Sequence, residues 1–184
     1  MTDKMADNTN LEFTGERFTP ECVREIWYEH YHRYAFAKRF VVDRNVLDAA
    51  CGEGYGSNIL ADIAKQVTGL DIDEDSITHA KSRYQKTNLN YIEGSCIQLP
   101  FADNSFDVVV SFETLEHLAG QQEMLAEFNR VLSDDGLLII STPDKKHYSD
   151  ATDFTNEFHV KELYKHEFEQ LLDRHWQEYK QMPF

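Results

Sequence analysis

Long apolar runs and basic residues are what this 184-residue sequence most clearly lacks. Its longest apolar runs, DVVVSF and GLLII, have the length of a strand, whereas a membrane helix needs roughly 20 apolar residues. Only 18 Lys and Arg stand against 33 Asp and Glu, which gives a formal net charge of -15. This balance disfavours nucleic acid, whose phosphates require a basic surface, and it disfavours an anionic membrane surface.

Cysteines are few and widely spaced. Cys22, Cys51 and Cys96 are odd in number and form no C-x-x-C pair, which predicts a reducing, cytoplasmic setting with neither a disulfide nor a zinc site. The eight histidines show no ligand-like spacing, because His30 and His32 lie two positions apart and would point to different sides of a helix. We therefore expect no bound metal.

Signals for a second domain are also missing, since the sequence has no internal repeat, Pro-rich linker or low-complexity block. Residues 1–10 are polar, without the apolar segment of a signal peptide, and we predict a disordered tail there. We predict one domain over residues 11–184. It comprises a helical lid at 11–43, a ligand-binding core at 44–143, and an acceptor-side segment with a final helix at 144–184.

Short apolar runs alternate with segments of helical periodicity from residue 45 onward. This alternation predicts an α/β fold, a Rossmann-like, doubly wound, mostly parallel sheet with helices on both faces. Strands are expected at residues 45–50, 66–72, 89–94, 105–112 and 137–142. Helices are expected at residues 24–40, 56–65, 75–85 (capped by Asp75 or Ser76), 121–132 and 160–175, with an SDDG turn at 133–136. Ligands of such sheets bind at the carboxyl ends of the strands.

The stretch VLDAACGEGYGS, residues 46–57, follows the first expected strand with three glycines in five positions. Glycine lets a ligand approach the backbone, and the free N–H groups of the next helix point toward the same place. Taken alone, the loop also fits a tight turn without a ligand. Asp71 ends the next strand 17 residues beyond Gly54, near the roughly 20-residue spacing of an acid that binds a ribose. Ile72 beside it offers an apolar edge to a base.

The chemistry around the loop distinguishes between nucleotide ligands. The glycines follow a G-x-G-x-G spacing, whereas a dinucleotide site has G-x-G-x-x-G. Asp48 stands at the end of the strand before the loop, where a carboxylate would repel a pyrophosphate. The same carboxylate would suit a ligand with an ammonium or sulfonium group, and this favours S-adenosylmethionine.

Four stretches, VLDAACGEGYGS, GLDID, EGSCIQLPFADNSFDVVVSFETLEHL and GLLIISTPD, resemble the successive motifs of class I S-adenosylmethionine-dependent methyltransferases. The resemblance covers about residues 44–143 and is typical of the small-molecule enzymes of that family. It implies a cofactor site made of Asp48, Gly52, Gly54, Asp71, Ile72, Ser95, Cys96 and Phe112. The first three would surround the methionine part, Ser95 and Cys96 the adenine edge, and the Phe112 backbone the amino-acid group. Ser95 departs from the Asp that many relatives have, so its contact with adenine carries no charge.

The fourth strand leads into the titratable groups Glu113, Glu116 and His117. The resemblance implies that this segment, and the later stretch with His159, face the methyl acceptor. We select His117, Glu113 and His159 as candidate catalytic residues, since a histidine can take a proton from a hydroxyl or amine. The alternative is that His117 only packs a helix end, because methyl transfer depends mostly on positioning.

The acceptor is predicted to be a small polar molecule, such as a sugar or another hydroxyl compound, because TGERFTP and FHVKEL resemble stretches of methyltransferases of glycan assembly. Quinone-pathway relatives are an alternative within the family. Outside it, the alternatives are a non-catalytic S-adenosylmethionine-binding module, a nicotinamide-dependent oxidoreductase and an aminopropyl transferase.

The family usually ends its sheet with a sixth strand and an antiparallel seventh. This sequence has material for the sixth at most, near residues 175–180. We expect either a shortened form of a longer protein or an open edge that a partner covers, as in a homodimer.

Overall fold

The structure, a computed structural model, describes residues 24–176. The predicted tail at residues 1–10 and all but the first two residues of the sixth strand expected near residues 175–180 lie outside this range, as does Cys22. For residues 24–29 the backbone alone is described.

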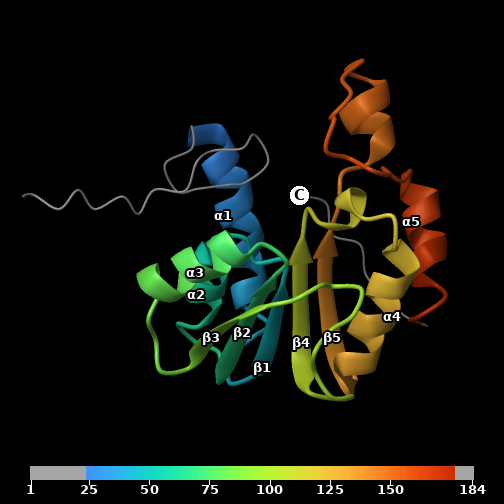
Figure 1. The fold of residues 1–184 in the computed structure, drawn as a ribbon. Coiled ribbons are helices and arrows are strands. Elements are labelled where there is room, and N and C mark those ends of the chain that lie inside the picture. The colour runs from blue at the N-terminus through green and yellow to red at the C-terminus, as the bar shows by residue number, and fades with distance from the viewer. Residues whose placement is uncertain (1–23, 177–184) are drawn as a thin grey trace, which may run out of the picture.

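Five strands form one parallel sheet, as the sequence predicted (Figure 1). The strands are β1 (Asn45–Ala49), β2 (Gln66–Asp71), β3 (Leu89–Glu93), β4 (Phe106–Phe112) and β5 (Leu132–Ser141). Their order across the sheet is β3-β2-β1-β4-β5, so the chain reverses its direction of winding between β1 and β4. In doubly wound sheets ligands bind at the carboxyl ends of the strands beside this reversal.

The helices lie on both faces of the sheet, in the layers that Figure 1 shows. They are α1 (Arg24–Lys38), α2 (Tyr55–Leu60), α3 (Glu74–Arg83), α4 (Gln121–Val131) and α5 (Lys165–Leu172), with short turns η1 (Leu115–His117) and η2 (Lys146–Asp150). Side chains of β1 alternate between the layers, because successive residues of a strand point to opposite faces. Val46 packs with α1 and α2, whereas Leu47 packs with α4 and α5.

Four details differ from the sequence predictions. The SDDG segment lies within β5, whose pairing jumps from Phe106–Leu132 to Val108–Leu137, so the extra residues are accommodated by a register shift instead of a separate turn. Asp73 caps α3 by accepting a hydrogen bond from the Ser76 N–H at 2.8 Å. The helix α5 begins later than expected. The helix α2 ends at Leu60, earlier than expected, and Tyr34 and Ala37 of α1 are buried in the core.

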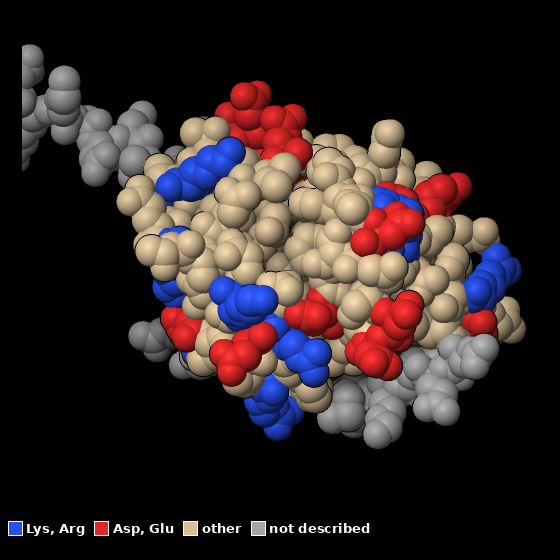
Figure 2. All heavy atoms as spheres, turned by 90° about the horizontal axis from the view of Figure 1, so that it is seen from below, with Lys and Arg blue, Asp and Glu red and all other residues tan. Residues whose placement is uncertain are grey.

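The surface carries charges of both signs. Figure 2, which views the molecule from below the sheet of Figure 1, shows basic side chains next to acidic ones. Lys38 and Lys86 both pair with Asp62, and Arg130 pairs with Glu127 and Asp103. Within residues 24–176 there is no helix with the length and apolar character needed to cross a bilayer.

Candidate functional site

The loop between β1 and α2 uses its glycines for two different purposes. A Cβ on Gly56 would lie 2.0 Å from the Tyr34 ring, and one on Gly54 would lie 2.7 Å from the Ala80 Cβ. These two glycines therefore let α1 and α3 pack closely against the loop. A Cβ on Gly52 would have nothing within 4 Å, and its φ of 55° is left-handed. Gly52 is thus the loop glycine that borders open space.

Asp71 meets this open position from the end of β2. Its Oδ2 accepts a hydrogen bond from the Gly52 N–H at 2.8 Å, and its Oδ1 accepts one from the Asp73 N–H at 3.0 Å. The carboxylate is therefore fixed beside the loop while it stays partly exposed. Ile72, the next residue, is 73% exposed and provides an apolar surface at the same strand end.

Ser95 and Cys96 follow β3 at the neighbouring strand end. The Ser95 Oγ is partly exposed and accepts a hydrogen bond from the Ile97 N–H at 3.4 Å. Cys96 is buried, and burial raises the pKa of its thiol to about 12, which keeps it protonated. This pKa fits a packing role for Cys96 at the end of β3 and disfavours a nucleophilic thiolate at neutral pH.

The structure places Asp48 beneath the loop. Its carboxylate is fully buried beneath the loop, where Ser57 donates to Oδ2 at 2.6 Å and the Tyr34 hydroxyl donates to Oδ1 at 3.1 Å. The side chain points to the α1 and α2 face of the sheet, as Val46 does, and so it joins the loop to those helices. Burial is the main cause that raises its pKa to about 6.

The carboxyl end of β4 carries two of the predicted residues. Phe112 is buried and packs edge-on against Tyr34, with ring centroids 5.1 Å apart. Glu113 has a left-handed φ of 51°, and its Oε1 accepts a hydrogen bond from the Ser141 hydroxyl at 2.6 Å. Its other oxygen lies 3.4 Å from the Arg33 guanidinium. The chain thus turns sharply where β4 ends, and α1 and β5 both hold the turn.

Beyond this turn, Glu116, His117 and His159 come together, and we call them the Glu–His–His cluster. One ligand atom from each residue lies within 4.8 Å of the others. The backbone carbonyl of Glu116 accepts hydrogen bonds from the Val160 N–H at 2.9 Å and from the Lys161 N–H at 3.0 Å. These two bonds fasten the segment after β5 to η1 and bring His159 to its place.

The Glu116 carboxylate is almost completely buried, with 1% of the residue exposed. Its Oε2 accepts a hydrogen bond from the Thr142 hydroxyl at 2.9 Å. Burial raises the pKa of Glu116 to about 7, and the negative charge of Glu113 adds to this effect.

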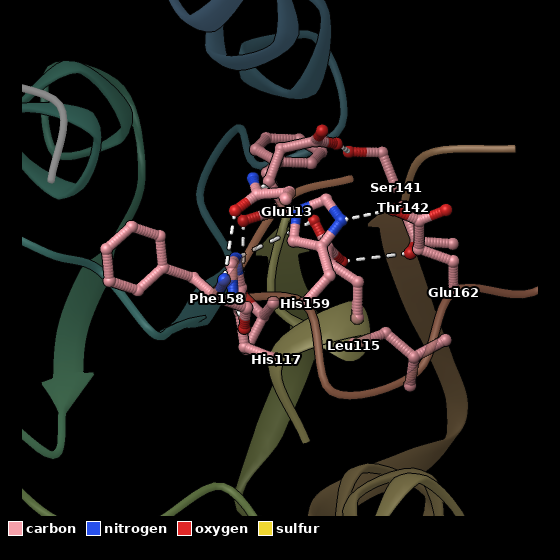
Figure 3. Close-up of polar contacts among 12 residues, drawn as sticks. Glu113, Leu115, His117, Ser141, Thr142, Phe158, His159 and Glu162 are labelled. Atoms are coloured by element: carbon pink, nitrogen blue, oxygen red, sulfur yellow. Dashed lines mark hydrogen bonds and ion pairs between the residues drawn. The ribbon is translucent and has the colours of Figure 1, made fainter. Parts of the chain in front are cut away.

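Each imidazole of the cluster is oriented by a partner on its Nδ1 (Figure 3). The Nδ1 of His117 lies 3.0 Å from the Phe158 carbonyl oxygen, and the Nδ1 of His159 lies 2.6 Å from Glu162 Oε1. Since both partners are acceptors, each Nδ1 carries a hydrogen, and in a neutral imidazole the lone pair then lies on Nε2. The two rings are 5.0 Å apart.

The family of the chain is shown by its similarity to known proteins. The sequence pattern of the methyltransferase domain matches residues 47–140, just over half of the chain. The chain belongs to the S-adenosylmethionine-dependent methyltransferase family.

Two relatives of this methyltransferase are probable S-adenosylmethionine-dependent methyltransferases. The one from Mycolicibacterium smegmatis is 37% identical over 166 residues, which cover 89% of this chain and 64% of that protein. The one from Mycobacterium tuberculosis is 38% identical over 165 residues, which cover 88% of this chain and 60% of that protein. The chain thus spans less than two thirds of the length of either relative. The YcgJ protein from Bacillus subtilis shares the fold, with a TM-score of 0.70 at 19% identity over 79% of this chain and 68% of that one.

The methyltransferase fold brings together the predicted residues in two groups. Gly52, Asp71 and Ile72 meet at the ends of β1 and β2, whereas Glu113, His117 and His159 lie beyond β4. Sequence reasoning did not select Glu116 or Glu162 as site residues. Glu116 gave no signal beyond its place beside His117, and the contact of Glu162 with His159 appears only once that segment is folded.

Proposed function

We propose that this methyltransferase binds S-adenosylmethionine at the carboxyl ends of β1 to β4 and transfers its methyl group to a hydroxyl-bearing acceptor. The single observation that carries the proposal is the convergence of a partly exposed carboxylate, Asp71, on Gly52, the loop glycine that borders open space. When bound, the cofactor supplies a methyl group on a sulfonium: the acceptor oxygen bonds to the methyl carbon, the C–S bond breaks, and its electron pair stays on sulfur.

The residues of the first group fit an adenosyl ligand. Asp71 already accepts one backbone N–H on each oxygen, and a carboxylate oxygen has a second lone pair for a ribose hydroxyl. Ile72 and Ile97, which are 73% and 43% exposed, offer apolar area to a base beside β2 and β3. Gly52 leaves the backbone open for the methionine part.

The residues of the second group suit the acceptor. We propose that Glu113, His117 and His159 orient the acceptor beside the end of β4, and that an imidazole receives the hydroxyl proton through its Nε2. Holding the acceptor in line supplies most of the rate, because positioning two reactants is worth several kcal/mol. A sugar or another hydroxyl compound satisfies these requirements.

The experiment measures binding of S-adenosylhomocysteine, the cofactor product, by calorimetry to wild type, Asp71→Asn and Asp75→Asn. Asp75 is an exposed acid on α3, so its replacement matches the change in charge without touching the site. A hydrogen bond to a charged group is worth about 1.5–3 kcal/mol, so Asp71→Asn should lose roughly 10- to 150-fold in affinity while Asp75→Asn stays near wild type. Equal affinities in all three proteins, or tighter binding of NAD than of S-adenosylhomocysteine, would refute the cofactor site.

Turnover separates the enzyme from a non-catalytic binding module. Radiolabelled methyl transfer from S-adenosylmethionine to a panel of sugars and other hydroxyl compounds should label at least one acceptor. Cofactor binding without label on any acceptor in the panel, or in a metabolite extract, would favour the binding module.

A further inference from the structure

The Glu–His–His cluster has the composition of a metal site with open coordination positions. Two nitrogens and one carboxylate oxygen from the protein are the donors of several catalytic metal centres, where substrate or water occupies the remaining positions. The Glu116 Oε1 and the His117 Nε2 are 3.9 Å apart. Two donors with bonds of about 2.0–2.2 Å lie about 3.4 Å apart at a tetrahedral angle, so this pair shares an ion after it closes by about half an ångström.

Each of the three side chains is also held by an outer partner in the way metal ligands usually are. Metal-binding histidines commonly donate their second ring N–H to a carbonyl or a carboxylate, which fixes the tautomer and the ring orientation. The Nδ1 of His117 faces the Phe158 carbonyl, and the Nδ1 of His159 faces the carboxylate of Glu162. The Thr142 hydroxyl binds Glu116 Oε2 and thereby leaves Oε1 directed toward the imidazoles.

The contacts of the Asn156 side chain indicate that the Nε2 of His159 carries a lone pair. The Asn156 side-chain amide lies 3.1 Å from that nitrogen through Nδ2, while its Oδ1 accepts the Phe158 N–H at 3.0 Å. The second contact fixes the amide orientation, so Nδ2 donates to the imidazole. The Nε2 atom therefore acts as an acceptor. A cation bound to this nitrogen would take the place of the hydrogen bond from Asn156.

The charge around the cluster also favours a cation. Glu116 and Glu162 have side chains that are 1% and 9% exposed, and Glu113 stands near Glu116 at the end of β4. Arg33 pairs with Glu113, and within residues 30–176 Glu116 and Glu162 have no cationic partner other than the imidazoles. Buried carboxylates need a balancing positive charge or protonation, and a divalent ion provides the charge.

We propose that Glu116, His117 and His159 bind a divalent transition-metal ion, such as Zn²⁺, Co²⁺ or Mn²⁺, and that this ion coordinates the hydroxyl oxygen of the methyl acceptor. The preference follows from the donors, since imidazole suits transition metals while Mg²⁺ prefers an all-oxygen shell. Coordination lowers the pKa of the hydroxyl, and its proton leaves to solvent water instead of to an imidazole, because each Nε2 then binds the ion. The acceptor role rests on the proposed function, whereas ion binding itself does not.

The experiment follows Co²⁺, whose visible absorption bands report coordination by nitrogen and oxygen. The full chain is freed of metal with a chelator, dialysed and titrated with Co²⁺. We expect one bound ion per chain, displaced by Zn²⁺ and unaffected by millimolar Mg²⁺. His159→Ala and Glu116→Gln should each weaken Co²⁺ binding at least tenfold, and Glu162→Gln, which alters only the outer partner, should weaken it about 10- to 100-fold.

His147→Ala serves as the matched control, because His147 is an exposed histidine of η2 with 72% of its side chain accessible. It should bind Co²⁺ as wild type does. Circular dichroism melting of each variant confirms that the protein is folded at the temperature of the titration. Glu162→Gln keeps the shape of the side chain, so it tests the site even if His159→Ala proves unfolded.

Two results would overturn the proposal: wild-type protein that gains no Co²⁺ absorption, or variants of the cluster that bind Co²⁺ as tightly as His147→Ala. Calorimetry with S-adenosylhomocysteine on the same metal-free protein keeps the two proposals apart. Cofactor binding without Co²⁺ binding refutes only the metal site and leaves the imidazoles as proton acceptors. Co²⁺ binding without cofactor binding refutes the proposed function and retains the metal site.

Discussion

Replacing Asp48 by Asn should change how the stability of this protein depends on pH. The carboxylate is completely buried, and burial raises its pKa from an ordinary value of 3.8 to about 6, despite hydrogen bonds from Ser57 and Tyr34 that act in the opposite direction. At 1.36 kcal/mol per pKa unit, the folded state of the wild type is destabilised by about 3 kcal/mol when this group is ionised.

The sign follows from which state binds the proton more tightly. Because the pKa of Asp48 is higher in the folded state than in the unfolded state, its contribution to stability is greatest below pH 3.8 and is lost as the pH rises through about 6. Asparagine at this position does not titrate. The free energy of unfolding of Asp48→Asn, relative to wild type, should therefore rise by about 2.5 kcal/mol between pH 4 and pH 8.

Urea unfolding of both proteins at half-unit pH steps over this range gives the difference between their free energies of unfolding. The contributions of the other titrating groups are the same in both proteins and cancel in this difference. Any effect of the amide on stability that does not depend on pH shifts the plot of this difference against pH up or down but leaves its shape unchanged. A difference that stays constant within about 0.5 kcal/mol from pH 4 to pH 8 would show that Asp48 is not the buried, titrating group described above.

Three further predictions concern the loop and the sheet edge. Ala50 has a left-handed φ of 59°, so Ala50→Gly should stabilise the protein by up to about 1 kcal/mol in urea unfolding, and a loss of stability would contradict the strain. Gly56→Ala should destabilise it by about 1–3 kcal/mol because the Cβ would lie 2.0 Å from Tyr34. Gly52→Ala, whose Cβ meets open space, should cost the roughly 1–2 kcal/mol of a left-handed alanine and also weaken S-adenosylhomocysteine binding; unchanged binding would refute the role of Gly52. Homodimerisation through the outer edge of β5 stays a prediction, and sedimentation that gives a monomer mass at every concentration would refute it.

The sequence by itself determined the α/β architecture and the meeting of Gly52 with Asp71. Strand–helix alternation and the nearly all-apolar run of β4 are local patterns, and a parallel sheet with helices on both faces follows from them. Gly52 and Asp71 were found in the same way, because consecutive strand ends of such a sheet must meet at one edge.

Only the tertiary structure decided the direction of Asp48 and the composition of the acceptor side. Asp48 stands at the expected position, but the strand's alternation turns its carboxylate toward α1 and α2, where Tyr34 and Ser57 close over it. His159 belongs to a long irregular segment with no periodicity to place it. Its approach to Glu116 depends on two backbone hydrogen bonds between segments far apart in the chain, and pairings of that kind leave no regular spacing in the sequence.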